Sequence, residues 1–151
     1  MKLPLAILIV AGALTPIPSR AGTTTATMPV SLEIAQGCAM TTGPLAFDDS
    51  ASAQATLRLR CTPGAAYSVM LDEGSNGRRR MVGDPAAEPV AYEIYQDAHG
   101  RRRWGANITE VVFGTAPAGG EMVLTAHGRA AASGAAAPGS YWDVVTVTVA
   151  F

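Results

Sequence analysis

Lysine is nearly absent from this 151-residue sequence. Lys2 is the only one, and arginine carries the remaining basic charge. Once residues 1–21 are set aside, for the reason given below, nine arginines face twelve acidic residues, a net charge of −3. This balance excludes a protein that binds nucleic acid through overall positive charge.

Long apolar runs are also missing, apart from one at the N-terminus. Residues 3–14 are almost wholly apolar, follow Lys2 and precede Ser19-Arg20-Ala21, whose small residues stand where a signal peptidase reads the chain. The pattern predicts a signal peptide over residues 1–21 and a secreted mature chain over 22–151. No later segment approaches the length of a membrane-spanning helix.

Helical spacing of apolar residues is absent as well. Instead, apolar and polar side chains alternate, for example over residues 57–61 and 90–95, and turn signals such as 74–77 separate these segments. Residues 108–113 suit a further short strand. Seven or eight short strands in one mature chain predict an all-β fold, an antiparallel β-sandwich of immunoglobulin-like kind.

Cysteine is scarce, with Cys38 and Cys61 the only two. In an exported chain, such a pair is most simply a structural disulfide. The alternative is a two-thiol metal or redox site, but the pair lacks a CxxC spacing and neighbouring histidines. A disulfide is therefore the prediction.

Residue patterns that support catalysis are missing too. His99 and His127 are far apart in sequence and have no acidic cluster beside them, so they predict no metal site. No serine lies in a nucleophile-elbow context. We therefore expect a protein that is not an enzyme and has no catalytic residues, metal or cofactor.

Both ends of the mature chain have the pattern of a half-buried strand. Near the start, every second residue is apolar: Met28, Val30, Leu32 and Ile34. Near the end, four more apolar residues alternate in the same way: Val145, Val147, Val149 and Phe151. Strands at both ends of a chain are prone to pair with other chains, which indicates that pairing is their purpose.

Four sequence features together resemble the spore coat protein U domain family, the secreted pilins of the archaic chaperone–usher pathway. The first two are an alternating strand that runs into a cysteine and a second strand that ends in a cysteine about twenty residues later. The others are a central motif followed by Trp-Gly and a C-terminal motif. These features are residues 28–38, residues 57–61, Tyr92-Glu93-Ile94-Tyr95-Gln96-Asp97 with Trp104-Gly105, and Gly128-Arg129 with residues 138–151.

The resemblance implies an immunoglobulin-like sandwich that is incomplete, because it lacks its own last strand. Residues 22–36 would be the N-terminal donor-strand extension and residues 37–151 the pilin domain. The donor side chains would be Met28, Val30, Leu32 and Ile34, and the acceptor groove would lie beside the C-terminal strand with its four apolar residues. A periplasmic chaperone would first fill this groove.

The same resemblance implies an assembly route and a role. At the outer-membrane usher, the donor strand of the next subunit would replace the chaperone. The product would be a surface fibre, or pilus, made of copies of this chain or of related pilins, and it would serve attachment or biofilm formation. This route involves neither nucleic acid nor insertion of the subunit into a membrane.

Two alternatives stay open at this point. The chain could be a self-complemented envelope protein, in which residues 28–34 fill their own groove and form no polymer. It could also be a single-domain adhesive module. Pro29 lies inside the proposed donor and lacks an N–H for the strand ladder, so it affects the register in which the strand can dock.

Two basic runs remain unassigned, Arg78-Arg79-Arg80 and Arg101-Arg102-Arg103. Both lie beside turn signals, so we expect solvated loop charge. The alternative is contact with an acidic surface, a polysaccharide or a nucleic acid.

Overall fold

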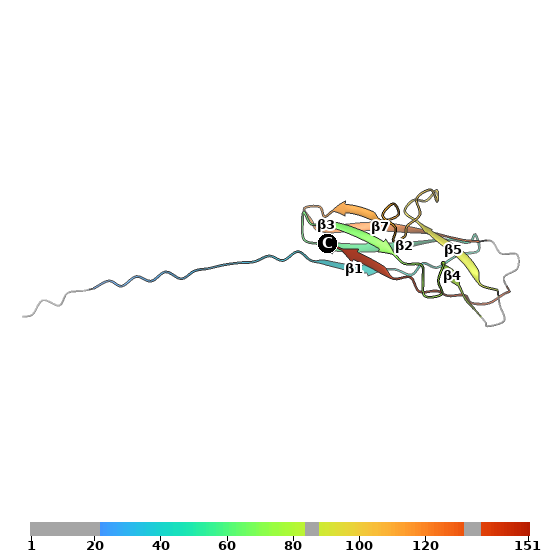
Figure 1. The fold of residues 1–151 in the computed structure, drawn as a ribbon, viewed down its shortest axis with the longest axis horizontal. Coiled ribbons are helices and arrows are strands. Elements are labelled where there is room, and N and C mark those ends of the chain that lie inside the picture. Colours follow the sequence, from blue (N-terminus) through green and yellow to red (C-terminus); the bar gives the residue numbers. More distant parts are fainter. Residues whose placement is uncertain (1–21, 84–87, 132–136) are drawn as a thin grey trace, which may run out of the picture. The chain divides into compact units, whose positions relative to one another are not determined.

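The chain folds into β-strands, as a computed structural model shows (Figure 1). The structure describes residues 22–83, 88–131 and 137–151, so the predicted signal peptide lies outside the described residues. The chain divides into two compact units, Met1–Glu33 and Ile34–Phe151. The described residues contain no helix, and therefore none that is long and apolar enough to cross a membrane.

The described residues of the second unit form eight strands. They are β1 Cys38–Thr42, β2 Ser52–Cys61, β3 Ala66–Leu71, β4 Arg80–Met81, β5 Val90–Tyr95, β6 Val112–Thr115, β7 Glu121–Ala130 and β8 Val147–Ala150. One sheet has the order β1-β2-β7-β5-β4 and the other has the order β6-β3-β8. All the strand pairs are antiparallel.

Alternation in the sequence explains why the sheets bury one face each. Along β2, every second side chain is buried, and the arginines between them are exposed. A strand places successive side chains on opposite faces, so this pattern turns one face towards the core. Leu57 and Leu59 are each only 2% exposed. The alternation predicted for this segment is therefore confirmed.

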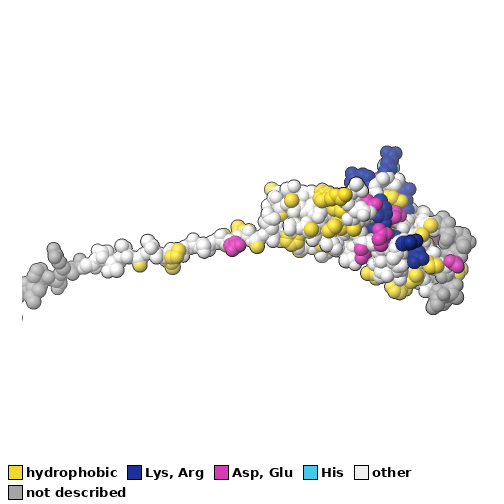
Figure 2. Space-filling view, in the orientation of Figure 1, with side chains coloured by type: hydrophobic (Ala, Val, Ile, Leu, Met, Phe, Trp, Pro, Cys, Tyr) yellow, Lys and Arg dark blue, Asp and Glu magenta, His cyan; other side chains and the backbone are white. Residues whose placement is uncertain are grey.

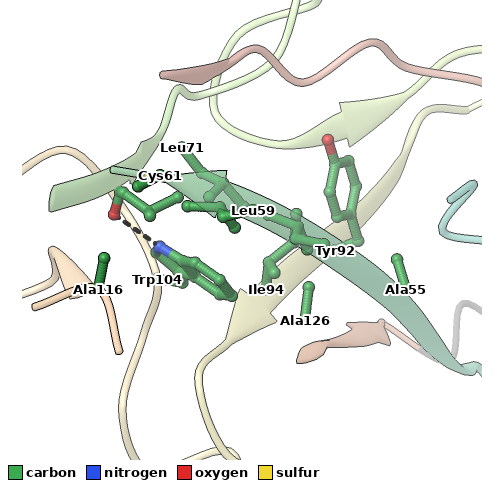
Figure 3. Packing of buried hydrophobic residues seen from close by; sticks show 11 residues of the cluster. Ala55, Leu59, Cys61, Leu71, Tyr92, Ile94, Trp104, Ala116 and Ala126 are labelled. Atoms are coloured by element: carbon green, nitrogen blue, oxygen red, sulfur yellow. Dashed lines mark hydrogen bonds between the residues drawn. The ribbon is translucent and has the colours of Figure 1, made fainter. Parts of the chain in front are cut away.

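The core lies between the two sheets (Figure 3). Trp104 is 1% exposed, and its indole N–H donates a 3.0 Å hydrogen bond to the carbonyl of Val69 on β3. Leu59, Tyr92 and Ile94 pack in the same cluster. An aromatic ring with a satisfied polar group can be buried without an unpaired donor, so Trp104 joins loop and sheet at the centre of the core.

A disulfide joins Cys38 to Cys61, at the start of β1 and the end of β2. These two residues are also opposite each other in the β1–β2 ladder. The predicted disulfide is therefore present, and it fastens the first strand of the sandwich to its neighbour.

The short strand expected over residues 108–113 lies further along the chain. β6 spans Val112–Thr115, and Ile108 is 77% exposed. Glu110 donates its N–H to the carbonyl of Asn107, which closes a turn where the prediction placed extended backbone. The expected boundary was wrong because one apolar residue in a turn resembles the start of a strand.

Candidate functional site

An apolar groove of about 790 Å³ opens between the two sheets. Its walls come from the segment that follows β1 and from the segment that leads into β8. Its floor includes Phe47 and Tyr92, whose rings meet edge to face with centroids 5.9 Å apart. Further lining comes from β2, β3, β5 and β7, in the residues Leu57, Leu71, Ile94 and Ala126. The groove therefore extends down to residues of the buried core.

Both strands beside this opening are edge strands. β1 is the last strand of the five-stranded sheet, and β8 is the last strand of the three-stranded sheet. Within the described ranges, each pairs on one side only, β1 with β2 and β8 with β3. An edge strand presents a row of N–H and C=O groups that can bind another strand.

The four predicted acceptor residues differ in their burial and in their position relative to the groove. Val145, Val147 and Val149 are half-buried and pack against the core, and the first two line the groove. Val147 and Val149 belong to β8, whereas Val145 precedes it. Phe151 lies beyond the end of β8, is 57% exposed and is not among the residues that line the groove.

Backbone hydrogen bonds show which groups of the C-terminal segment face outwards. Trp142 exchanges bonds of 2.9 and 3.0 Å with Val82, and the carbonyls of Val144 and Thr146 accept from Ser75 and Asp72. Trp142 therefore points its backbone groups towards Val82, directly after β4, whereas Val144 and Thr146 point their carbonyls towards the segment that follows β3. Because backbone direction alternates along a strand, the intervening valines direct theirs to the open edge.

Asp143 fastens this segment at the rim of the groove. Its Oδ1 accepts bonds from the Ser75 hydroxyl at 2.9 Å and from the backbone and side-chain nitrogens of Asn76 at 3.1 and 3.0 Å. Its Oδ2 accepts a 2.7 Å bond from the Tyr92 hydroxyl. Gly74 stands beside this carboxylate with φ +80°, and a Cβ there would lie 2.1 Å from Oδ2. The turn therefore needs glycine at this position.

These contacts keep Asp143 charged and Tyr92 neutral. Burial tends to raise the pKa of Asp143, but the bonds from Tyr92, the Val144 N–H and Ser75 outweigh burial and hold the pKa below its ordinary value. Burial, and then the bond to Asp143, raise the pKa of Tyr92 well above its ordinary value. The tyrosine hydroxyl therefore donates to a carboxylate across the neutral range.

The arginine runs contain two residues that are not solvated loop charge, so the prediction was wrong for them. Arg79 is 1% exposed and binds Glu93 at 3.0 Å and the carbonyls of Asp72 and Trp104. Arg103 binds Glu93 as well, at 2.7 Å. Its other partners are Glu73 and Glu110.

The other four arginines of these runs are exposed, as predicted: Arg78, Arg80, Arg101 and Arg102. On the face of the sandwich seen in Figure 2, basic side chains lie next to acidic ones and form no patch of one sign. Arg79 and Arg103 can lie away from solvent because they share a network of ion pairs with acidic side chains, and a buried charge must be paired and hydrogen-bonded. Their role is therefore structural.

The described residues of the first unit contain no strand. Met28, Val30 and Leu32 are 83%, 89% and 85% exposed. Ile34, the first residue of the second unit, is 75% exposed. Alternate apolar side chains exposed to this degree are an aggregation hazard in a secreted protein unless a partner covers them.

Sites for other chemistry are not found in the described ranges. No group of three or more His, Cys, Asp or Glu side chains there could hold a metal ion. Every buried side-chain nitrogen and oxygen in that part of the chain has a hydrogen-bond partner. The feature that the described residues leave incomplete is the apolar groove with its open edge.

Comparison with known proteins agrees with this architecture. No curated protein matches the sequence significantly. One solved structure that resembles the chain is the CsuC-CsuE chaperone-tip adhesion subunit pre-assembly complex from the archaic chaperone-usher Csu pili of Acinetobacter baumannii. A chain of that complex superposes with a TM-score of 0.66 at 22% identity, over 78% of this chain and 40% of its own length.

The likeness to that structure confirms the predicted all-β antiparallel sandwich. The present chain spans only two fifths of the length of its neighbour, so the likeness concerns one part of that protein. The family model of the Spore Coat Protein U domain matches residues 24–148, which is most of the sequence. This chain therefore belongs to the spore coat protein U domain family, as its motifs predicted.

Proposed function

We propose that this protein is a structural subunit of a secreted surface fibre, a pilus assembled by donor-strand exchange. The observation that carries the proposal is the apolar groove of about 790 Å³ beside the open edge of β8. Residues 28–34 of a second copy have the alternation that would fill it. Main-chain bonds to the edge would supply affinity, and alternate side chains would set the register.

The magnitude of the gain suits a durable fibre. Complete burial of Met28, Val30, Leu32 and Ile34 would contribute on the order of 6–12 kcal/mol before the cost of ordering the segment. The donor segment and the groove are different surfaces of the subunit, so the contact would be head to tail. Such contacts do not close and produce polymers.

The proposal includes the route by which the fibre forms. The chain would cross the periplasm, where a chaperone would occupy the groove, and would reach the cell surface through an outer-membrane usher. A chaperone would cover the open edge of β8, which could otherwise pair with strands of other proteins. Attachment or biofilm formation is the role that we propose for the fibre, and the subunit would catalyse no reaction.

Gel migration of the exported protein tests the proposal. The intact chain, a chain without residues 22–34 and a control chain without residues 22–27 would each be expressed with chaperone and usher. Donor-strand exchange predicts a ladder in unheated samples of the intact and control chains, which collapses on heating and is missing from the longer deletion. Monomers in all three samples would show that the N-terminal strand serves its own sandwich or none.

A further inference from the structure

A donor strand from the same chain and a donor strand from another copy would run through the groove in opposite directions. β8 runs towards the end of the sandwich where β1 begins, and the C-terminus lies at that end (Figure 1). A strand from the same chain must turn back at residues 35–37, directly before β1. It would therefore run antiparallel to β1 and parallel to β8, whereas a strand from a second copy can run antiparallel to β8.

The backbone hydrogen bonds of β1 and of the C-terminal segment show which of their residues face the open edge. The carbonyl of Gly37 and the N–H of Gly43 bond towards β2, so Cys38, Met40 and Thr42 direct their backbone groups to the open edge of β1. In the C-terminal segment, the groove-facing valines direct theirs to the open edge of β8, as described above. On β8, the groove-lining Val147 thus also turns its backbone to the docking strand, and on β1 the same holds for Thr42, which lines the groove, and for Cys38 and Met40, which pack against the core.

This geometry decides which donor residues bond to β8. Antiparallel neighbours bond through residues whose side chains share a face, and parallel neighbours bond through residues on opposite faces. A donor that is antiparallel to β8 and buries Met28 and Val30 therefore bonds to β8 through those residues. A donor that is parallel to β8 bonds to it through Pro29, Ser31 and Glu33.

We propose that Pro29 prevents the N-terminal strand from folding back into its own groove and so directs it to a second copy of the chain. In the fold-back arrangement, the nitrogen of Pro29 faces β8, where it cannot donate and where its ring crowds the neighbouring backbone. In the antiparallel arrangement, that nitrogen faces β1 instead, at the end of the groove where β1 begins, so the bond that is missing is the first one of the β1 ladder. The inference rests on the proposed donor-strand function and adds the residue that selects its partner.

The rest of the segment would permit the fold-back. Ala35-Gln36-Gly37 has the length of a three-residue hairpin loop, with glycine at the position that such loops place in the left-handed region. That hairpin would set Ile34 beside Cys38 and bring Pro29 level with the interior of the acceptor segment. A second copy entering antiparallel to β8 would instead leave Pro29 near the end of the groove where β1 begins. Pro29 thus removes an interior bond to β8 in the fold-back arrangement and only a terminal bond to β1 in the other.

Substitution of Pro29 tests the inference in the full chain. Pro29→Ala restores the N–H, and Pro117→Ala is the matched control, in an exposed turn after β6. After export with chaperone and usher, Pro29→Ala should raise the ratio of compact monomer to polymer about tenfold, because a buried carbonyl of the groove edge regains its donor. Amide hydrogen exchange of that monomer should show protected residues 28–34. Pro117→Ala should match the natural sequence.

Disulfide cross-linking tests the direction independently. Glu33 should lie near Thr146 if the donor is antiparallel to β8 and near Ala150 if it is parallel. The pair Glu33→Cys with Thr146→Cys should therefore link neighbouring subunits of the polymer, and a register shift of two residues would move the link to Val144→Cys. The pair Glu33→Cys with Ala150→Cys should link within one chain, and only when Pro29→Ala is also present.

The outcomes separate this inference from the proposed function. A ladder from both the natural chain and Pro29→Ala, with equal monomer ratios, would leave fibre assembly intact and overturn the role of Pro29. An intramolecular link between positions 33 and 150 in the natural chain would overturn it as well. Absence of any ladder from the natural chain would overturn the proposed function and the inference together.

Discussion

Tyr92→Phe isolates the bond that holds the acceptor segment at the rim of the groove. The substitution removes the hydroxyl that donates to Asp143 at 2.7 Å and keeps the ring, which is 7% exposed. A hydrogen bond to a charged group contributes about 1.5–3 kcal/mol, and its loss leaves one carboxylate oxygen without its partner. We expect the free energy of unfolding to fall by about 2 kcal/mol, equivalent to a fall in Tm of about 8 °C.

Guanidinium unfolding of the full chain at low concentration measures this loss. Tyr95→Phe is the matched control, on the same strand, because the described residues give its hydroxyl no hydrogen bond. The control should stay within about 0.5 kcal/mol of the natural chain, as is usual away from specific interactions. A loss of that small size for Tyr92→Phe would refute the role assigned to the bond.

The hydrogen bond from Tyr92 to Asp143 should also make the difference in unfolding free energy between the natural chain and Tyr92→Phe depend on pH. The pKa of Asp143 is held below its ordinary value of 3.8, so folding stability that comes from its ionised form is present above that value. It is lost as the pH falls through 3.8 towards the lower pKa of the folded protein. The difference between the natural chain and Tyr92→Phe should therefore be full at pH 7 and shrink below about pH 4. A constant difference down to pH 2.5 would contradict this reasoning.

Three further predictions concern the disulfide, the buried charge and the groove. Replacement of Cys38 and Cys61 by serine should cost roughly 3 kcal/mol, because the bridge closes a loop with a sequence separation of 23; denaturant unfolding measures it. Arg79→Ala should cost about 2–3 kcal/mol by the same measurement, since the carbonyls of Asp72 and Trp104 would lose a charged donor while Glu93 keeps Arg103, and a cost below about 1 kcal/mol would contradict the role of these bonds. Val147→Arg should abolish the heat-sensitive ladder while Thr148→Arg, which faces outwards, keeps it; equal ladders would show that the groove is not the docking site.

The sequence predicted the elements whose pattern is strong and regular. The alternation around Leu57 and Leu59 appears in the structure as alternate burial along β2. The two cysteines are paired as expected. In these cases, one local pattern has one stable solution: a strand with an apolar face or an oxidised pair in an exported chain.

The sequence did not predict features that depend on distant partners. Arg79 looks like solvated charge because its neighbours in the run are arginines, yet its backbone has φ 50° and its side chain reaches Glu93. Val145 looks like part of the last strand, but the strand begins two residues later. The adjacent Thr146 gives its N–H to the carboxylate of Asp72 and not to a strand partner. Side-chain partners more than ten residues away decide such positions, and no local pattern encodes them.

Complementation between two defective chains tests the central claim most directly. One chain would lack residues 22–34 and keep its groove, and the other would carry Val147→Arg and keep its donor strand. Donor-strand exchange predicts that neither polymerises alone and that their co-expression gives a heat-sensitive complex with one copy of each. Polymers from either chain alone, or no complex from the two together, would contradict the claim that the N-terminal strand of one copy fills the groove of another.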